Sequence, residues 1–137
     1  MRKLFSTRYS DTGISVSLFF LRIAFGFLLF FNHGLPKLMK FETMKDSFPD
    51  PLHVGNTTTS LLLVIFAEVF CALLLVMGLL SRASAFVLVI LFGVAIFIIH
   101  KNDPISQKES AYLYLTVSTA LLLCGPGKWS IDNLISK

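Results

Sequence analysis

Four long apolar runs constrain this chain more than any other feature, and the first of them carries a charge near its centre. That run, SLFFLRIAFGFLLFFNHGLPK over residues 17–37, holds Arg22 among phenylalanines and leucines. Three more runs follow at about residues 61–80, 83–99 and 111–124. A helix that crosses a bilayer needs about 20 apolar residues. The sequence therefore predicts an all-α membrane protein, a bundle of four transmembrane helices, in which Arg22 needs a partner.

The composition and the short polar breaks agree with one compact membrane domain. The 137 residues are 55% hydrophobic and 15% charged, and this charged share is below that of a typical soluble domain. We expect a single domain over residues 1–137, with spans at about residues 14–35, 60–80, 82–100 and 107–124. No small-residue cleavage site follows the first run, so we interpret it as a permanent span rather than a signal peptide.

The distribution of basic residues predicts the orientation. With four spans, both termini face the same side of the membrane. That side carries six Lys and Arg residues, and the opposite side carries five. Basic residues concentrate on the cytoplasmic side of membrane proteins, which favours cytoplasmic termini. The net charge of +4 would face membrane lipid headgroups. Nothing in the sequence suggests a basic and aromatic platform for nucleic acid.

Glu68, in the second apolar run, is the acidic residue expected closest to Arg22. Counted by helical rise, Arg22 lies about 12 Å from the cytoplasmic side and Glu68 about 10 Å from the outer side. An extended arginine side chain can close much of the remaining gap, and ions inside a membrane are usually paired. We therefore predict that Glu68 holds Arg22 between the first two spans. The pair could equally serve only to fix helix register.

Further polar side chains are expected near the outer ends of the spans. A basic stripe at helical spacing follows Arg22 along the first span, the third span ends in a histidine, and a polar stripe begins the fourth. If these faces converge, they line a cleft that could orient a polar headgroup with an apolar tail, such as a quinone or a lipid. The candidate ligand-binding residues are Arg22, His33, Lys37, Glu68, His100, Glu109 and Tyr112.

Simpler interpretations of these residues stay open. His33 and Lys37 could only cap the first span at the interface, where basic groups reach water. His100 could be an ordinary interfacial histidine. The two histidines could also hold a haem or a metal ion, although no paired His spacing on one helix favours this. No nucleophile elbow or catalytic triad is evident. We therefore predict no metal, no catalytic residue and no intrinsic cofactor, leave enzymatic activity open, and regard quinone as a molecule that could bind.

Four ordered motifs resemble the DoxX family of bacterial integral membrane proteins. They read LRIAFGFLLFFNHGLPKL, FPDPLHVGNTTTSLLLVIFAEVFCALLLVMGLLSR, HKNDPISQKESAYLYL and GPGKWSID, and together they cover about residues 16–134. The resemblance implies a four-helix protein of the bacterial cytoplasmic (inner) membrane. It also implies an association with redox work, because related proteins are subunits of a thiosulfate:quinone oxidoreductase or of other membrane oxidoreductase complexes. All candidate residues except Tyr112 are carried over from these motifs, with Gly34 added.

The resulting expectation is a small inner-membrane subunit that binds a quinone-like or lipid-like molecule and serves a membrane redox complex. Its partners would be membrane lipid and another membrane or redox protein subunit. The alternative is a non-enzymatic membrane scaffold or assembly factor in which the Arg22–Glu68 pair is structural. A small-solute transporter is a third interpretation, which the lack of broken helices and inverted repeats disfavours.

Overall fold

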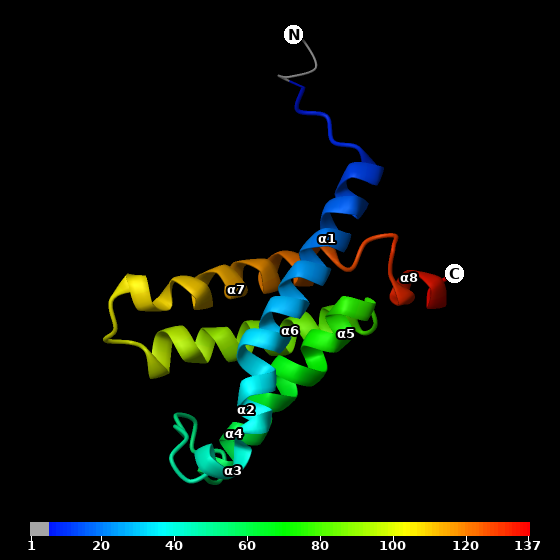
Figure 1. The fold of residues 1–137 in the computed structure, drawn as a ribbon. Helices are drawn as coiled ribbons and strands as arrows, with labels where there is room; N and C mark the ends of the chain where they lie inside the picture. Colours follow the sequence, from blue (N-terminus) through cyan, green and yellow to red (C-terminus); the bar gives the residue numbers. More distant parts are fainter. Residues whose placement is uncertain (1–5) are drawn as a thin grey trace.

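The computed structural model describes residues 6–137, and every regular element in that range is a helix (Figure 1). Three helical stretches are long and apolar enough to cross a membrane: Asp11–Met39, Thr57–Met77 and Ser81–Ile99. A fourth long helix, α7 (Ile105–Cys124), has 20 residues but begins with the polar residues Ser106 to Ser110. The all-α prediction is thus confirmed. Length and composition support a membrane crossing for three helices, whereas we had predicted four.

The first stretch is one continuous helix that passes through a proline. It consists of α1 (Asp11–Leu29), a π-helical turn η1 (Phe30–Gly34) and α2 (Leu35–Met39). We expected the helix to end at about residue 35, before Pro36. A proline ring normally clashes with the carbonyl four residues earlier. For Pro36 that carbonyl belongs to Asn32, which lies in the wider π turn η1. In this turn the Leu35 N–H bonds to the Phe30 carbonyl five residues back, and the helix continues through the proline.

The next two stretches form a tight hairpin, and their bounds agree with the predicted spans to within about three residues. The first begins after Asn56, whose side chain accepts a hydrogen bond from Thr59 N at 2.8 Å, and ends at Gly78 in a left-handed conformation. Each stretch contains a π-helical turn, as the first stretch does. The elements are α4 (Thr57–Ile65), η2 (Phe66–Cys71), α5 (Ala72–Met77), α6 (Ser81–Val94) and η3 (Ala95–Ile99).

The helices pack as two pairs that cross at a large angle (Figure 1). In one pair, α1 lies along α5 and η1 lies against η2; in the other, α6 lies along α7. Gly26 permits close approach in the first pair, since a Cβ there would lie 2.9 Å from the Ala72 carbonyl oxygen. The pairs meet through contacts of α6 with η2 and of α7 with α1. Their shared core includes Leu18, Phe25, Leu29, Leu75, Leu88, Phe92 and Leu121.

The ends of the helices gather in two places in the molecule. At one end, the C-terminal segment (residues 125–136), which includes the short helix α8 (Ile131–Ile135), contacts α1 and the turn between α5 and α6. At the other end lie α2, the start of α4, the end of η3 and the start of α7. A loop over residues 45–56, which follows the short helix α3 (Phe41–Met44), also lies there. The candidate site occupies this second end.

Candidate functional site

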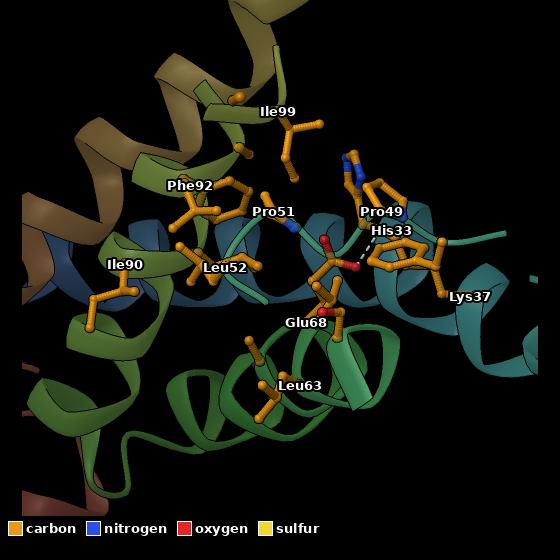
Figure 2. A pocket seen from close by; sticks show the side chains of 18 of the residues that line it. His33, Lys37, Pro49, Pro51, Leu52, Leu63, Glu68, Ile90, Phe92 and Ile99 are labelled. Carbon is orange, nitrogen blue, oxygen red and sulfur yellow. Dashed lines mark hydrogen bonds and ion pairs between the residues drawn. The ribbon is translucent and has the colours of Figure 1, made fainter. Parts of the chain in front are cut away.

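A cavity of about 620 Å³ opens between the two helix pairs at this end. Apolar side chains make up most of its walls, and Figure 2 shows Leu63, Ile90, Phe92 and Ile99 among them. Polar groups are fewer and come from every wall. Those that line the cavity are His33, Lys37, Ser60, Glu68, His100, Gln107, Ser110 and Tyr114. The lining therefore suits a molecule that is largely apolar and has one polar part.

An ion pair between a buried carboxylate and a partly exposed ammonium group is the strongest polar feature of this cavity. Lys37 Nζ lies 2.5 Å from Glu68 Oε2, with side-chain exposures of 20% and 6% (Figure 2). Lys37 comes from α2 and Glu68 from the π turn η2, which packs against η1. A charge held away from water needs such a partner, because desolvation of an isolated ion is costly. The pair brings two full charges to the cavity wall while adding no net charge.

An aromatic cluster holds the second polar group, His33, in place. The His33 and Tyr114 rings form a T-shaped pair with a centroid distance of 5.2 Å and an interplanar angle of 89°. Tyr114 also stacks on Phe92 at 5.2 Å and contacts Phe25 edge-on at 5.4 Å. These contacts immobilise both rings without using a nitrogen of His33 or the hydroxyl of Tyr114. Each can therefore bond to a molecule in the cavity.

The loop over residues 45–56 covers one side of the cavity. Phe48, Pro49, Pro51 and Leu52 line it, and Figure 2 shows Pro49, Pro51 and Leu52 facing the helices. Asp50 anchors the loop to α4: its Oδ1 accepts from Ser60 Oγ at 2.7 Å and from Val54 N at 3.1 Å. The hydrogen bond from Ser60 is the main reason that the pKa of Asp50 lies below its ordinary value. The loop is thus tied down by a charge-assisted bond.

The predicted pairing of Arg22 with Glu68 is wrong. Arg22 lies at the opposite end of the molecule, where its Nη2 donates to the Trp129 carbonyl oxygen at 2.7 Å. Its guanidinium group lies directly against Gly78, since a Cβ on Gly78 would collide with Arg22 Nη1. Glu68 lies ten residues before Gly78, about 15 Å away along the helix axis. The error came from the assumed depths, because the first two helices are offset further along their axes than the apolar runs indicated.

Only some of the other predicted site residues come together. His33, Lys37, Glu68 and His100 line the cavity, whereas Arg22, Glu109 and Tyr112 do not. Glu109 and Tyr112 are exposed on the outer surface of α7. Residues two positions apart on a helix point in nearly opposite directions, so it is Tyr114 that faces the cavity. The packing of α7 against α6 decides which tyrosine faces inward, and the polar stripe alone did not reveal it.

His100 lines the cavity but is more exposed than Glu68. Its Nδ1 lies 2.6 Å from Asp103 Oδ2, and both side chains are about half exposed. Within residues 6–137, no group of three or more His, Cys, Asp or Glu side chains is arranged to hold a metal ion.

These features define an all-helical membrane protein with a partly enclosed, amphipathic cavity between its helix pairs. The sequence model of the DoxX family matches residues 17–101, and the chain belongs to this family. The match contains the cavity residues His33, Lys37, Glu68 and His100. It ends before α7, whereas the motifs we quoted extend to about residue 134.

Comparison with other proteins adds one relative. An uncharacterized protein of Haemophilus influenzae is 32% identical to this chain over 132 residues, which cover 91% of this chain and 87% of that protein. No solved structure matches the chain significantly.

Proposed function

We propose that this DoxX-family protein binds one amphipathic molecule, a quinone or a lipid of similar shape, in the cavity between its helix pairs. The observation that carries the proposal is the juxtaposition of an apolar cavity of about 620 Å³ with the Lys37–Glu68 ion pair and His33. Ligand sites usually combine such apolar walls with a few convergent polar groups. Lys37, His33 and Tyr114 can each donate to a carbonyl or hydroxyl oxygen of a headgroup.

The proposed setting is the bacterial cytoplasmic (inner) membrane, crossed four times with both termini in the cytoplasm. The 20-residue length of α7 and its packing along α6 and against α1 support a fourth crossing. The small excess of Lys and Arg on the side of the termini supports their cytoplasmic position. The cavity would then open near the outer leaflet, within reach of membrane-soluble molecules.

The proposed role is that of a subunit serving a membrane redox complex. The DoxX resemblance supports this role, and the cavity supplies what such a subunit would need to hold a quinone headgroup and its tail. Electron transfer itself would require a partner protein or the bound molecule, because the quinone supplies the redox-active group. The protein would contribute binding, orientation and the exclusion of water.

A membrane scaffold or assembly factor is the second candidate function. Large apolar side chains remain exposed along the first pair of helices, including Phe27, Phe31, Phe66 and Phe70. This surface could contact lipid or a helix of another subunit. The Arg22–Glu68 pair that we expected for a scaffold is replaced by a contact between Arg22 and the C-terminal segment. A scaffold would need this surface but would not need ligand in the cavity.

A binding experiment separates the two functions. The purified chain in mild detergent should be titrated with decylubiquinone while its thermal unfolding is followed, and binding should raise the melting temperature. His33→Ala and Tyr114→Phe should each weaken binding about threefold to tenfold, since each removes one hydrogen-bond donor. Tyr112→Phe is the matched control and should bind like the wild type. If neither quinones nor common lipids stabilise the wild type, the ligand-binding function is wrong.

A further inference from the structure

The carboxylate of Glu68 has one oxygen that the protein does not use. Oε2 bonds to Lys37, whereas Oε1 accepts no hydrogen bond from any of residues 6–137. Glu68 as a whole is only 5% exposed, and it lines the cavity. Figure 2 shows its carboxylate directed to the side of the cavity where His33 lies. Oε1 is not among the fully buried unpaired side-chain atoms of residues 6–137, so it is accessible from the cavity and can accept a hydrogen bond from a molecule bound there.

We infer that the cavity selects a headgroup bearing a hydroxyl group, which donates its proton to Glu68 Oε1, over the same headgroup without a donor. This inference rests on the proposed function, because it names the class of amphipathic molecule that the cavity prefers. A carboxylate paired with an ammonium group is an acceptor only. A carbonyl or an ether oxygen has no proton to donate. Its lone pairs would lie against those of Oε1, and the two oxygens would repel each other.

The neighbours of Glu68 complete the site for a hydroxyl group. The Lys37 ammonium group uses one of its three protons for Glu68, and its other two protons have no partner among the described residues. The ring nitrogens of His33, at the same wall, make no hydrogen bond to any of residues 6–137. A hydroxyl oxygen can therefore accept from Lys37 or His33 while its proton goes to Glu68. Hydrogen bonds of this kind, with one charged partner, are about twice as strong as neutral ones.

The charge of the site argues against an anionic headgroup. Lys37 is already neutralised by Glu68, so the phosphate of a phospholipid would meet no unpaired positive charge and would lie beside a carboxylate. Two negative charges that lie side by side repel each other strongly in surroundings that exclude water. The apolar walls formed by Leu63, Ile90 and Phe92 then accommodate the alkyl or ring part of the molecule. A neutral phenol or alcohol with an apolar tail fits both requirements.

A pair of probes that differ by one proton donor tests this inference. The purified wild-type chain in detergent should be titrated with 4-decylphenol and with 4-decylanisole, its methyl ether. We expect the phenol to bind roughly tenfold or more tightly, which is the discrimination that one charge-assisted hydrogen bond provides. In a double variant, Lys37→Met with Glu68→Met, the ratio of the two affinities should fall to within about twofold. The two probes partition differently into detergent, but this affects the affinity ratio equally in both proteins. The change in the ratio between wild type and double variant is therefore free of it.

Each outcome of the titrations is decisive. Tyr112→Phe, which removes a phenol hydroxyl outside the cavity, is the control and should keep the wild-type ratio. Equal affinity of the wild type for the two probes would overturn the hydroxyl preference while leaving the binding of amphipathic molecules intact. A preference that persists in the double variant would show that Glu68 is not the acceptor and would also overturn it. If neither probe binds and decylubiquinone does not bind either, both the inference and the proposed function are wrong.

Discussion

Gly34 lies directly against the backbone of Glu68. A Cβ atom added at Gly34 would be 2.6 Å from the Glu68 carbonyl oxygen and 2.8 Å from Val69 Cγ2. Both residues belong to π-helical turns, which are frequent at functional sites. The absence of a side chain at Gly34 lets η1 approach η2 closely. That approach brings Lys37, three residues further along the first helix, within reach of the Glu68 carboxylate.

Gly34→Ala should therefore separate the two π turns and weaken the ion pair as well as the packing. Overpacking of a tight contact costs about 1–3 kcal/mol in the free energy of unfolding. Thermal unfolding in detergent measures this effect. Gly93→Ala is the matched control, since nothing lies within 4 Å of a Cβ at Gly93 and alanine favours a helix by about 1 kcal/mol. Equal melting temperatures for the two variants would contradict the close contact at Gly34.

The Lys37–Glu68 pair should behave as a coupled unit. Lys37→Met leaves the buried Glu68 carboxylate without its partner, which costs about 3–5 kcal/mol in soluble proteins, and Glu68→Met leaves the partly exposed Lys37 unpaired. The double variant removes both charges and should be milder than either single change. Chemical or thermal unfolding of the four proteins in detergent gives the coupling energy. The matched cycle of Arg22→Met with Glu68→Met should be additive, because these two residues lie far apart.

Arg22 should hold the C-terminal segment rather than the helix pair as a whole. Its Nη2 bonds to the Trp129 carbonyl, and Phe19 contacts both its guanidinium group and the Trp129 ring. Its Nε and Nη1 are buried and have no hydrogen-bond partner among residues 6–137, so replacing Arg22 by methionine also removes the cost of keeping these groups away from water. We expect Arg22→Met to lower the unfolding free energy by only about 1–2 kcal/mol, since these two effects oppose each other.

Hydrogen exchange followed by mass spectrometry distinguishes this local role from a global one. In Arg22→Met, peptides covering residues 125–136 should exchange at least about tenfold faster, whereas peptides from α4 and η2 should change little. Arg8→Met, which removes an exposed arginine, is the control. Uniformly faster exchange in every helix would contradict a local role for Arg22.

Asp132 should make the stability depend on acid pH. Its carboxylate accepts from Leu80 N at 2.7 Å and from Ser81 N at 2.8 Å, at the start of α6. Burial raises the pKa of Asp132, but these hydrogen bonds and the nearby Arg22 outweigh it and leave the pKa below its ordinary value. The stabilisation is thus fully present above the unfolded-state pKa, about 3.9, and is lost as the pH falls through the lower folded-state value.

Asp132→Asn tests this pH dependence. At pH 7 the variant should be less stable by about 1 kcal/mol, because it loses a charge-assisted hydrogen bond. The difference from the wild type should shrink as the pH is lowered from 4.5 to 3, as measured by unfolding in detergent. Asp46→Asn, which changes an exposed carboxylate, is the control. A difference that stays constant down to pH 3 would show that the Asp132 carboxylate does not stabilise α6.

The sequence by itself determined which segments are helical and that the chain suits a membrane. Long apolar runs bounded by polar breaks predicted every long helix to within a few residues of its observed bounds, apart from the continuation of the first helix through Pro36. These features are local, since each backbone hydrogen bond of a helix joins residues four or five positions apart. The polar groups His33, Lys37, Glu68 and His100 could also be chosen from the sequence, because charged or titratable groups are rare among such apolar neighbours.

Only the tertiary structure decided which of these groups meet. The axial offset between the first two helices, shaped by close contacts at Gly26 and Gly34, pairs Glu68 with Lys37 and leaves Arg22 to the C-terminal segment. The packing of α7 on α6 turns Tyr114 inward, and the loop over residues 45–56 covers one side of a cavity whose other walls come from helices far apart in the sequence. A shift of one helical turn, about 5.4 Å along the axis, changes the partner of every side chain without changing any local pattern. Helix formation therefore followed from the sequence, whereas the partners of the charged residues depended on contacts between residues far apart in the chain.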